Sequence, residues 1–195
     1  MDSVRWYDQH AQDFFDSTIN VEMGGLYSRF LKTMQPKAKI LDAGCGAGRD
    51  TLFFSMQGYD VQAFDAAPIL VELVRKHTGI NVQVMRFEDL KCQDEFDGVW
   101  ACASLLHFDK HELERALARL FAALKVGGVL YTSFKYGTEI YERDGRQFYP
   151  FNEESFIEVI TAHMHVELDS IWITHDVRKE RTDEKWLNCL VRRIE

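Results

Sequence analysis

The sequence predicts an α/β protein built on a single doubly wound, mainly parallel seven-stranded sheet, and two observations predict it. Short apolar runs of strand length alternate along the chain with segments that have the apolar spacing of amphipathic helices, which is typical of parallel βαβ units. In addition, Gly44, Gly46 and Gly48 follow the first apolar run at a strand-to-helix turn. In nucleotide-binding folds, such a turn brings the main chain and the first N–H groups of a helix close to a ligand.

The strands and helices of the predicted core follow in order from this alternation. Strands are expected at KILDA (39–43), DVQAFD (60–65), NVQVMR (81–86), FDGVWACA (96–103) and GGVLYTSF (127–134). Helices are expected between them at TLFFSMQG (51–58), PILVELVRKHTG (68–79) and KHELERALARLFAALKVGG (110–128). Pro68 marks a helix start and Gly79 a helix end, while Asp109 and Glu112 form a capping-box pattern.

The pattern changes after Phe134. A polar, aromatic loop, KYGTEIYERDGRQFYP, is expected to lead to a helix that begins at Asn152, and VELDSIWITHDV and KWLNCLVRRI are expected to form a closing strand pair with the last strand antiparallel. We expect one domain over residues 1–195. It consists of an N-terminal helical cap (1–35), a ligand-binding core (36–135) and a C-terminal part with the loop, helix and closing strands (136–195).

Composition excludes several classes of function. A net charge of −8 argues against nucleic acid as a partner, because phosphate binding demands a basic face. The basic run RKER (178–181) is interpreted as a solvated loop. No apolar stretch is long enough for a membrane helix, and the polar N-terminus lacks the features of a signal peptide, so a cytoplasmic monomer or weak homodimer without a membrane partner is expected.

Metal and disulfide chemistry are not indicated either. Four dispersed cysteines form no C-x-x-C pair and are expected to be reduced thiols: Cys45, Cys92, Cys102 and Cys189. His107 and His111 have a spacing that can bind a metal ion, but no further ligand accompanies them, and no metal site is expected. Cys45 has no basic neighbour to lower its pKa and is interpreted as a small filler of the turn.

The spacing of the glycines narrows the class of ligand that the turn can bind. A dinucleotide-binding turn requires G-x-G-x-x-G, whereas Arg49 stands at the third position here and the pattern is acidic-x-G-x-G-x-G. Asp42, at the end of the first strand, can accept a hydrogen bond from an ammonium group or orient an amide of the turn. Asp65, at the end of the second strand, can accept hydrogen bonds from both hydroxyls of a ribose. The pattern therefore favours a nucleoside cofactor without a pyrophosphate.

Five segments in this order and spacing carry a family resemblance: ILDAGCGAGRDT, AFDAAP, RFEDL, FDGVWACASLLHF and LKVGGVLYTSF. The chain resembles the class I S-adenosylmethionine-dependent methyltransferases over about residues 36–135. WYDQHAQDFFDST and WLNCLVRR further resemble a small bacterial, tellurite-resistance-like branch. The resemblance implies a Rossmann-like methyltransferase fold, S-adenosyl-L-methionine as cofactor and methyl transfer to a small soluble acceptor.

The resemblance also implies a set of cofactor contacts: Asp42, Gly44, Cys45, Gly46, Asp65, Ala66, Phe87, Glu88, Ala101, Cys102 and, from the N-terminal helix, Tyr7 or Phe14. Of these, the glycines lie against the methionine part and Asp65 binds the ribose hydroxyls. Phe87 and Glu88 frame the adenine, and the main chain at 101–102 faces the amino group. Tyr7 has the alternative role of a packing anchor for its helix.

On the acceptor side, the residues leave alternatives open. If the acceptor is a hydroxyl or protonated amine, one base is useful, and His107 is the candidate; a thiolate or metalloid anion needs none. The loop after the fifth strand is hypothesised to form a lid in which Arg146, with Lys135, attracts an anionic or polar acceptor. The alternative is that this segment is a solvated surface loop without a role in binding. Two other functions stay open: a catalytically silent S-adenosylmethionine-binding regulatory protein and a NAD-dependent oxidoreductase.

Overall fold

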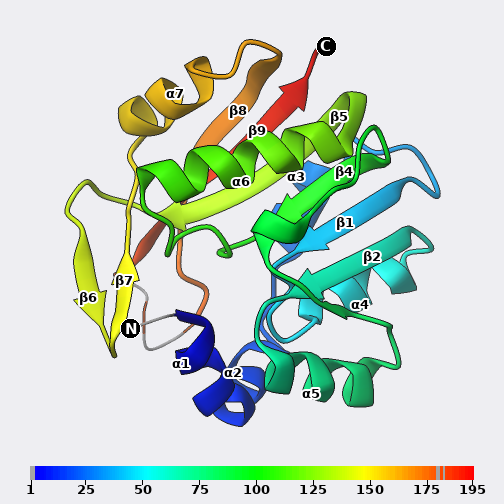
Figure 1. Ribbon diagram of the computed structural model, residues 1–195, viewed down its shortest axis with the longest axis vertical. Coiled ribbons are helices and arrows are strands. Elements are labelled where there is room, and N and C mark those ends of the chain that lie inside the picture. The colour runs from blue at the N-terminus through cyan, green and yellow to red at the C-terminus, as the bar shows by residue number, and fades with distance from the viewer. Residues whose placement is uncertain (1–2, 179–180, 182) are drawn as a thin grey trace.

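The computed structural model describes residues 3–178, 181 and 183–195 of the chain. Its centre is a seven-stranded sheet in the order β3-β2-β1-β4-β5-β9-β8 (Figure 1). The strands are β1 (Lys39–Ala43), β2 (Asp60–Asp65), β3 (Gln83–Val84), β4 (Phe96–Ala101), β5 (Leu124–Lys135), β8 (Val166–His175) and β9 (Lys185–Arg193). On one side of β1 the sheet continues with β2 and β3, and on the other side it continues with β4, β5, β9 and β8. The direction in which the chain adds strands therefore reverses after β3. This reversal beside β1 is where doubly wound sheets bind ligands.

The predicted fold class is confirmed. Strands β1 to β5 pair in parallel, whereas β9 pairs antiparallel with both β5 and β8. The last strand of the chain is therefore the antiparallel one, as expected. It lies between β5 and β8 rather than at the edge of the sheet.

Helices cover both faces of the sheet. They are α1 (Ser3–Gln9), α2 (Ala11–Thr18), α3 (Gly24–Leu31), α4 (Arg49–Met56), α5 (Pro68–Thr78), α6 (Lys110–Ala123) and α7 (Glu153–Thr161), with a 3-10 turn η1 at Phe87–Asp89. Figure 1 shows α6 and α7 on one face and α3 and α4 behind the other. Helices α1 and α2 lie below the sheet, where α2 contacts α5 and α1 contacts both α5 and β7.

The two faces have separate cores because successive strand residues point to opposite sides. On the α6–α7 face, residues such as Leu41, Val99 and Leu130 pack against helix residues such as Leu117. On the other face, Trp100 is fully buried, stacks on Tyr131 with ring centroids 3.9 Å apart and contacts α3 and α4. The predicted capping box at the start of α6 and the Pro68 start and Gly79 end of α5 are also present.

Two predicted elements have boundaries that lie well away from those in the structure. The third strand spans only Gln83–Val84, because it is the edge strand and pairs with β2 alone, at two positions. The predicted helix over 110–128 ends at Ala123, because Leu124 already pairs with Phe96 of β4 and starts β5. Helix and strand therefore meet without a loop.

The predicted loop over 135–150 is also wrong, since its centre is a β-hairpin. Strands β6 (Tyr141–Arg143) and β7 (Arg146–Phe148) pair antiparallel around a two-residue turn. Asp144 and Gly145 both have positive φ (54° and 73°), as a type I′ hairpin turn requires, and Asp-Gly is a preferred dipeptide for it. The rings of Tyr141 and Phe148 stack across the hairpin with centroids 5.0 Å apart.

Candidate functional site

A cavity of about 520 Å³ opens at the carboxyl edge of the parallel strands, between the sheet, the N-terminal helices and the β6–β7 hairpin. Most of the predicted site residues line it: Tyr7, Phe14, Gly44, Cys45, Gly46, Asp65, Ala66, Phe87, Cys102, His107 and Arg146. These residues come from segments far apart in the sequence. The fold thus brings together the predicted cofactor side and the predicted acceptor side in one continuous space.

The glycine turn after β1 is held tightly against the neighbouring strand ends. The N–H groups of Gly44 and Cys45 both donate to the carbonyl of Phe64, at 2.9 Å each. Gly44 has a φ of 74°, and a Cβ added there would lie 2.5 Å from the Cβ of Ser104, after β4. A side chain at this position would therefore be strained and would clash, so the turn requires glycine for its close approach to the loop after β4.

Asp65 lies at the end of β2 with both carboxylate oxygens fixed. The N–H of Gly46 donates to one oxygen at 2.9 Å and the N–H of Ala67 to the other at 3.0 Å. Burial raises the pKa of Asp65, although these backbone hydrogen bonds oppose the shift. Since a carboxylate oxygen has two acceptor sites, each keeps capacity for one more donor. This arrangement fits the two hydroxyls of a ribose.

Three predicted contacts lie outside the cavity lining. Asp42 is buried beneath the turn and accepts a hydrogen bond from the Thr51 hydroxyl at 2.6 Å; burial and the charge of Asp50 raise its pKa well above the usual range. Glu88 is exposed on the 3-10 turn. Ala101 is fully buried in the core below the cavity. The structure therefore brings none of these three side chains into contact with the cavity.

A buried polar cluster that the sequence analysis missed lies under the turn. Asp50 accepts from Nε and Nη2 of Arg49 at 2.6 and 3.0 Å, from the Tyr27 hydroxyl at 2.5 Å and from Nε1 of Trp100 at 2.8 Å. Burial alone would raise the pKa of Asp50, but the Arg49 guanidinium and these hydrogen bonds hold it below the usual value. No local sequence pattern predicts the cluster, because its members come from three elements.

Tyr7, His107 and Arg146 form a second contact set in the cavity lining. Nδ1 of His107 lies 2.7 Å from the carbonyl oxygen of Gln147, and its Nε2 lies 3.0 Å from the Tyr7 hydroxyl. A carbonyl only accepts, so Nδ1 carries the proton and Nε2 of the neutral ring accepts from Tyr7. Burial and the charge of Arg146 lower the pKa of His107 to about 4, against the hydrogen bond to Gln147.

Arg146 links the hairpin to the N-terminal helix. Its guanidinium lies over the ring of Trp6, 3.4 Å from the centroid, and Nη1 donates to the Tyr7 hydroxyl at 3.4 Å. Nη2 donates to the exposed Asp144 at 3.4 Å. The side chain is 10% exposed, and Nε is buried without a hydrogen-bond partner. A buried donor of this kind is costly unless a ligand pairs with it.

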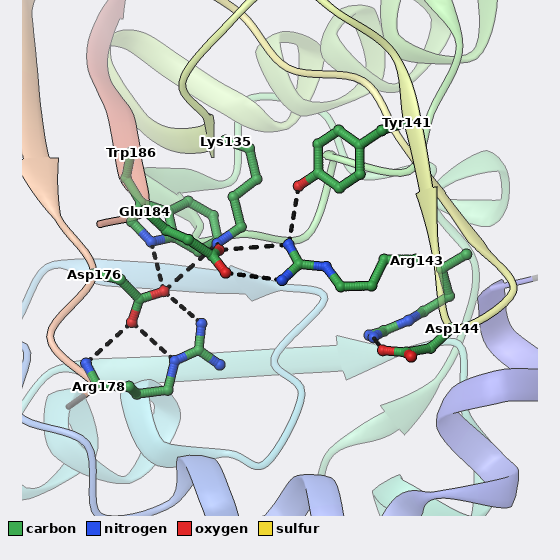
Figure 2. Close-up of polar contacts among 9 residues, drawn as sticks. Lys135, Tyr141, Arg143, Asp144, Asp176, Arg178, Glu184 and Trp186 are labelled. Atoms are coloured by element: carbon green, nitrogen blue, oxygen red, sulfur yellow. Dashed lines mark hydrogen bonds and ion pairs between the residues drawn. The ribbon is translucent and has the colours of Figure 1, made fainter. Parts of the chain in front are cut away.

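Figure 2 shows an ionic cluster, of which Lys135, Asp176 and Arg178 also line the cavity. Glu184 bonds both Lys135 and Arg143, with Arg143 Nη1 at 2.8 Å. Asp176 accepts from Nε and Nη2 of Arg178 at 2.9 and 2.6 Å and lies 3.5 Å from Lys135 Nζ. The cluster therefore joins the hairpin to the segment between β8 and β9.

The cluster corrects the interpretation of RKER as a solvated loop. Arg178 is 25% exposed and lines the cavity, as does Arg181; Lys179 and Glu180 lie outside the described residues. The four cysteines are unpaired in the structure, and burial raises the pKa of Cys45 well above the usual range. Within residues 3–178, 181 and 183–195, no group of three or more His, Cys, Asp or Glu side chains could hold a metal ion, and no helix is long and apolar enough to cross a membrane.

Comparison with known proteins adds independent findings. Residues 40–128 match the family model of a methyltransferase domain. A ubiquinone biosynthesis O-methyltransferase of Xanthomonas campestris is 36% identical over 106 residues, which are 50% of this chain and 43% of that relative. The chain thus spans less than half of the length of this relative.

Two solved structures have the same fold. A 1,6-didemethyltoxoflavin-N1-methyltransferase of Burkholderia thailandensis, with bound 1,6-didemethyltoxoflavin and S-adenosylhomocysteine, has a TM-score of 0.79 and 23% identity and covers 100% of this chain and 86% of its own. A TehB-like S-adenosylmethionine-dependent methyltransferase of Corynebacterium glutamicum has a TM-score of 0.71 and 24% identity, with 98% of each chain covered.

The family match over residues 40–128 and the curated relative both indicate a methyltransferase domain in this part of the chain. The resemblance of the motifs to a methyltransferase domain is thereby confirmed for residues 40–128. The structural likenesses show the fold alone, so the tellurite-resistance-like branch stays a prediction.

Proposed function

We propose that this protein binds S-adenosylmethionine and transfers its methyl group to a small soluble acceptor. The observation that carries the proposal is the Asp65 carboxylate, fixed by Gly46 and Ala67 beside a glycine turn at the switch point of the sheet. In the proposed complex, the turn lies against the methionine part, Asp65 binds the ribose and Phe87 contacts the adenine. The bound cofactor supplies an activated methyl group on a sulfonium, so the protein mainly aligns the acceptor and excludes water.

The acceptor is proposed to occupy the part of the cavity between the hairpin and the β8–β9 segment. The aromatic side chains of Phe148 and Trp186 line this part, and so do the cationic side chains of Arg146, Lys135 and Arg178. This lining favours a small polar or anionic molecule. The Burkholderia relative, crystallised with 1,6-didemethyltoxoflavin, supports an acceptor of small size.

His107 is proposed to act as a base through Tyr7 rather than directly. Its Nε2 already accepts from the Tyr7 hydroxyl at 3.0 Å. An acceptor hydroxyl or amine would pass its proton to the Tyr7 oxygen while Tyr7 passes its own proton to Nε2. The proton ends on His107 as the acceptor gains the methyl group, and it leaves to solvent with the product. Burial raises the pKa of Tyr7, which keeps the hydroxyl protonated for this transfer.

Calorimetric titration tests the cofactor. We expect S-adenosylmethionine and S-adenosylhomocysteine to bind and NADH not to bind. Replacing Asp65 with alanine should weaken binding of both adenosyl ligands by about 1.5–3 kcal/mol, the usual loss of charge-assisted hydrogen bonds, and the variant should stay folded by circular dichroism.

Three results would each contradict part of the assignment. Tight NADH binding with no affinity for either adenosyl ligand would favour an oxidoreductase. An unchanged dissociation constant in folded Asp65→Ala would show that the ribose binds elsewhere. If the adenosyl ligands bind but no acceptor in a broad panel is methylated, a regulatory binding protein becomes the better description.

Replacing Arg146 with alanine tests the acceptor side. We expect the Michaelis constant of an active acceptor to rise, or turnover to fall, at least tenfold, about 1.4 kcal/mol, because the buried Nε donor is proposed to pair with the acceptor. Cofactor affinity should change little. Arg143→Ala is the matched control, since Arg143 lies on the same hairpin but bonds Glu184. Parental kinetics for Arg146→Ala would remove Arg146 from the acceptor site.

A further inference from the structure

Three cationic side chains share two carboxylates in the ionic cluster of Figure 2. The cations are Lys135, Arg143 and Arg178, and the carboxylates are Asp176 and Glu184. Burial alone would raise the pKa of both carboxyl groups, but hydrogen bonds from the cations hold it below the ordinary value. Both groups are therefore ionised at neutral pH. The five side chains keep one positive charge that they do not compensate among themselves.

Arg178 keeps hydrogen-bond donors that the cluster does not use. Its main-chain N–H donates to Asp176 at 3.1 Å, and its Nε and Nη2 donate to the same carboxylate at 2.9 and 2.6 Å. These bonds occupy the Nε edge of the guanidinium, and among the described residues Nη1 has no hydrogen-bond partner. A guanidinium has five N–H donors in a planar fork. The edge formed by Nη1 and Nη2 can therefore bind another group through two parallel hydrogen bonds.

This guanidinium belongs to the cavity lining. The Arg178 side chain is 25% exposed and that of Asp176 is 3% exposed, so the pair extends from a buried carboxylate to a more accessible cation. Burial raises the pKa of Tyr7, and the charges of Arg146 and Arg178 oppose that shift. Arg178 therefore acts electrostatically on the hydroxyl that is proposed to carry the proton. An anion bound to Arg178 would share the cavity with the reacting group.

Asp176 is fixed in place and orients this guanidinium. It also accepts a hydrogen bond from Nε1 of Trp186 at 3.0 Å, and Nζ of Lys135 lies 3.5 Å away. Lys135 in turn bonds Glu184 and lies over the ring of Trp186, 3.8 Å from the centroid. An ion pair between residues two positions apart connects no separate elements, so its effect on Arg178 is one of orientation. Asp176 is therefore a positioning residue.

We infer that the methyl acceptor carries a carboxylate group and that the Nη1–Nη2 edge of Arg178 binds it. The inference rests on the proposed function and narrows its polar or anionic acceptor to one class. A carboxylate matches the edge, because its two oxygens can accept two parallel N–H bonds in one plane. It also compensates the remaining positive charge of the cluster. Lys135 and Arg143 are less suited to this role, because their charged groups already bond Glu184.

Matched pairs of acceptors that differ only in this group test the inference. Each pair is a small hydroxyl, amine or thiol compound, supplied as the carboxylic acid and as its primary amide, and formation of S-adenosylhomocysteine measures turnover. In the parent protein, the acid should have a Michaelis constant at least tenfold lower than the amide. Arg178→Gln should give both similar Michaelis constants, with kcat and cofactor affinity little changed. Arg143→Gln is the matched control and should keep the preference, because Arg143 has the same charge but bonds Glu184.

Two further variants separate binding by Arg178 from an effect on folding. Arg178→Lys keeps a charge beside Asp176 but has no planar two-donor edge. It should lose most of the preference, and it decides the test if Arg178→Gln does not fold by circular dichroism. Asp176→Asn leaves the guanidinium without its orienting charge, so the Michaelis constant should rise for the acid and change little for the amide.

The possible results distinguish this inference from the proposed function. A tenfold preference for the acid in a folded Arg178 variant would overturn the inference, as would an equal rise in the Michaelis constants of acid and amide. Equal use of acids and amides by the parent protein would also overturn it, while the proposed methyl transfer would stand. If the adenosyl ligands bind but neither acids nor amides are methylated, the proposed transfer fails, and this inference fails with it.

Discussion

Replacing Asp50 with asparagine is expected to lower the free energy of unfolding by about 3–5 kcal/mol, because removal of one partner leaves the Arg49 charge buried without compensation. The side chains of this ion pair are only 8% and 19% exposed. For a chain of this length, such a loss corresponds to a melting temperature lower by roughly 6–20 °C. Chemical and thermal denaturation followed by circular dichroism measure both quantities.

An exposed ion pair supplies the control. Lys125 and Asp97 lie 2.8 Å apart with side chains 46% and 38% exposed, so Lys125→Gln should cost less than about 1 kcal/mol. Equal stabilities for Asp50→Asn and the parent protein would show that the buried cluster contributes nothing net.

The same variant has a predicted pH signature. The pKa of Asp50 is lower in the folded protein than its ordinary value, and the ordinary value is about 3.9. Stability from this group is therefore present above about pH 4 and is lost as the pH falls through the folded-state pKa. Asp50→Asn should lack this part of the acid dependence.

Replacing Tyr7 with phenylalanine is expected to lower kcat at least a hundredfold on a hydroxyl or amine acceptor. The Tyr7 hydroxyl is proposed to carry the proton to His107, and a positioned base contributes roughly 10²–10⁴-fold. Steady-state kinetics on a hydroxyl acceptor and on a thiol acceptor measure the effect. A thiolate needs no base, so its kcat should change much less.

Two further variants separate a proton relay from simple packing. His107→Gln keeps a hydrogen-bond acceptor for Tyr7 but cannot take a proton, and it should lose as much activity as Tyr7→Phe. The double variant should lose little more, because residues that act as a unit are not additive. Equal losses on the hydroxyl and thiol acceptors would contradict the relay and assign Tyr7 a packing role.

The pH profile gives an independent readout of the relay. The pKa of His107 is lowered to about 4, so the ring is neutral and Nε2 is available above that pH. In the parent protein, kcat/KM should therefore fall as the pH drops through about 4 rather than through the ordinary value of about 6.5. His107→Gln should lack this acid limb.

The β6–β7 hairpin has a local sequence signal, although a loop was predicted for this segment. Asp144-Gly145, with Tyr141 and Phe148 three positions outside it on either side, is a strong hairpin pattern, and the structure has both residues at positive φ. The extent of β3 is a different case. Nothing within NVQVMR indicates that the strand is an edge strand with a single partner, because that depends on the order of strands in the sheet.

By itself, the sequence determined the sheet class, the glycine turn and the acidic strand ends at Asp42 and Asp65. These features are encoded locally, because the period of apolar residues and the freedom of glycine act within a few residues. Only the tertiary structure decided the contacts of Tyr7, which lies 100 residues from His107 and 139 from Arg146. It likewise decided that Tyr27 and Trp100 donate hydrogen bonds to Asp50. Such contacts arise where separate elements pack together, and side-chain packing across long separations has no periodic signature in the chain.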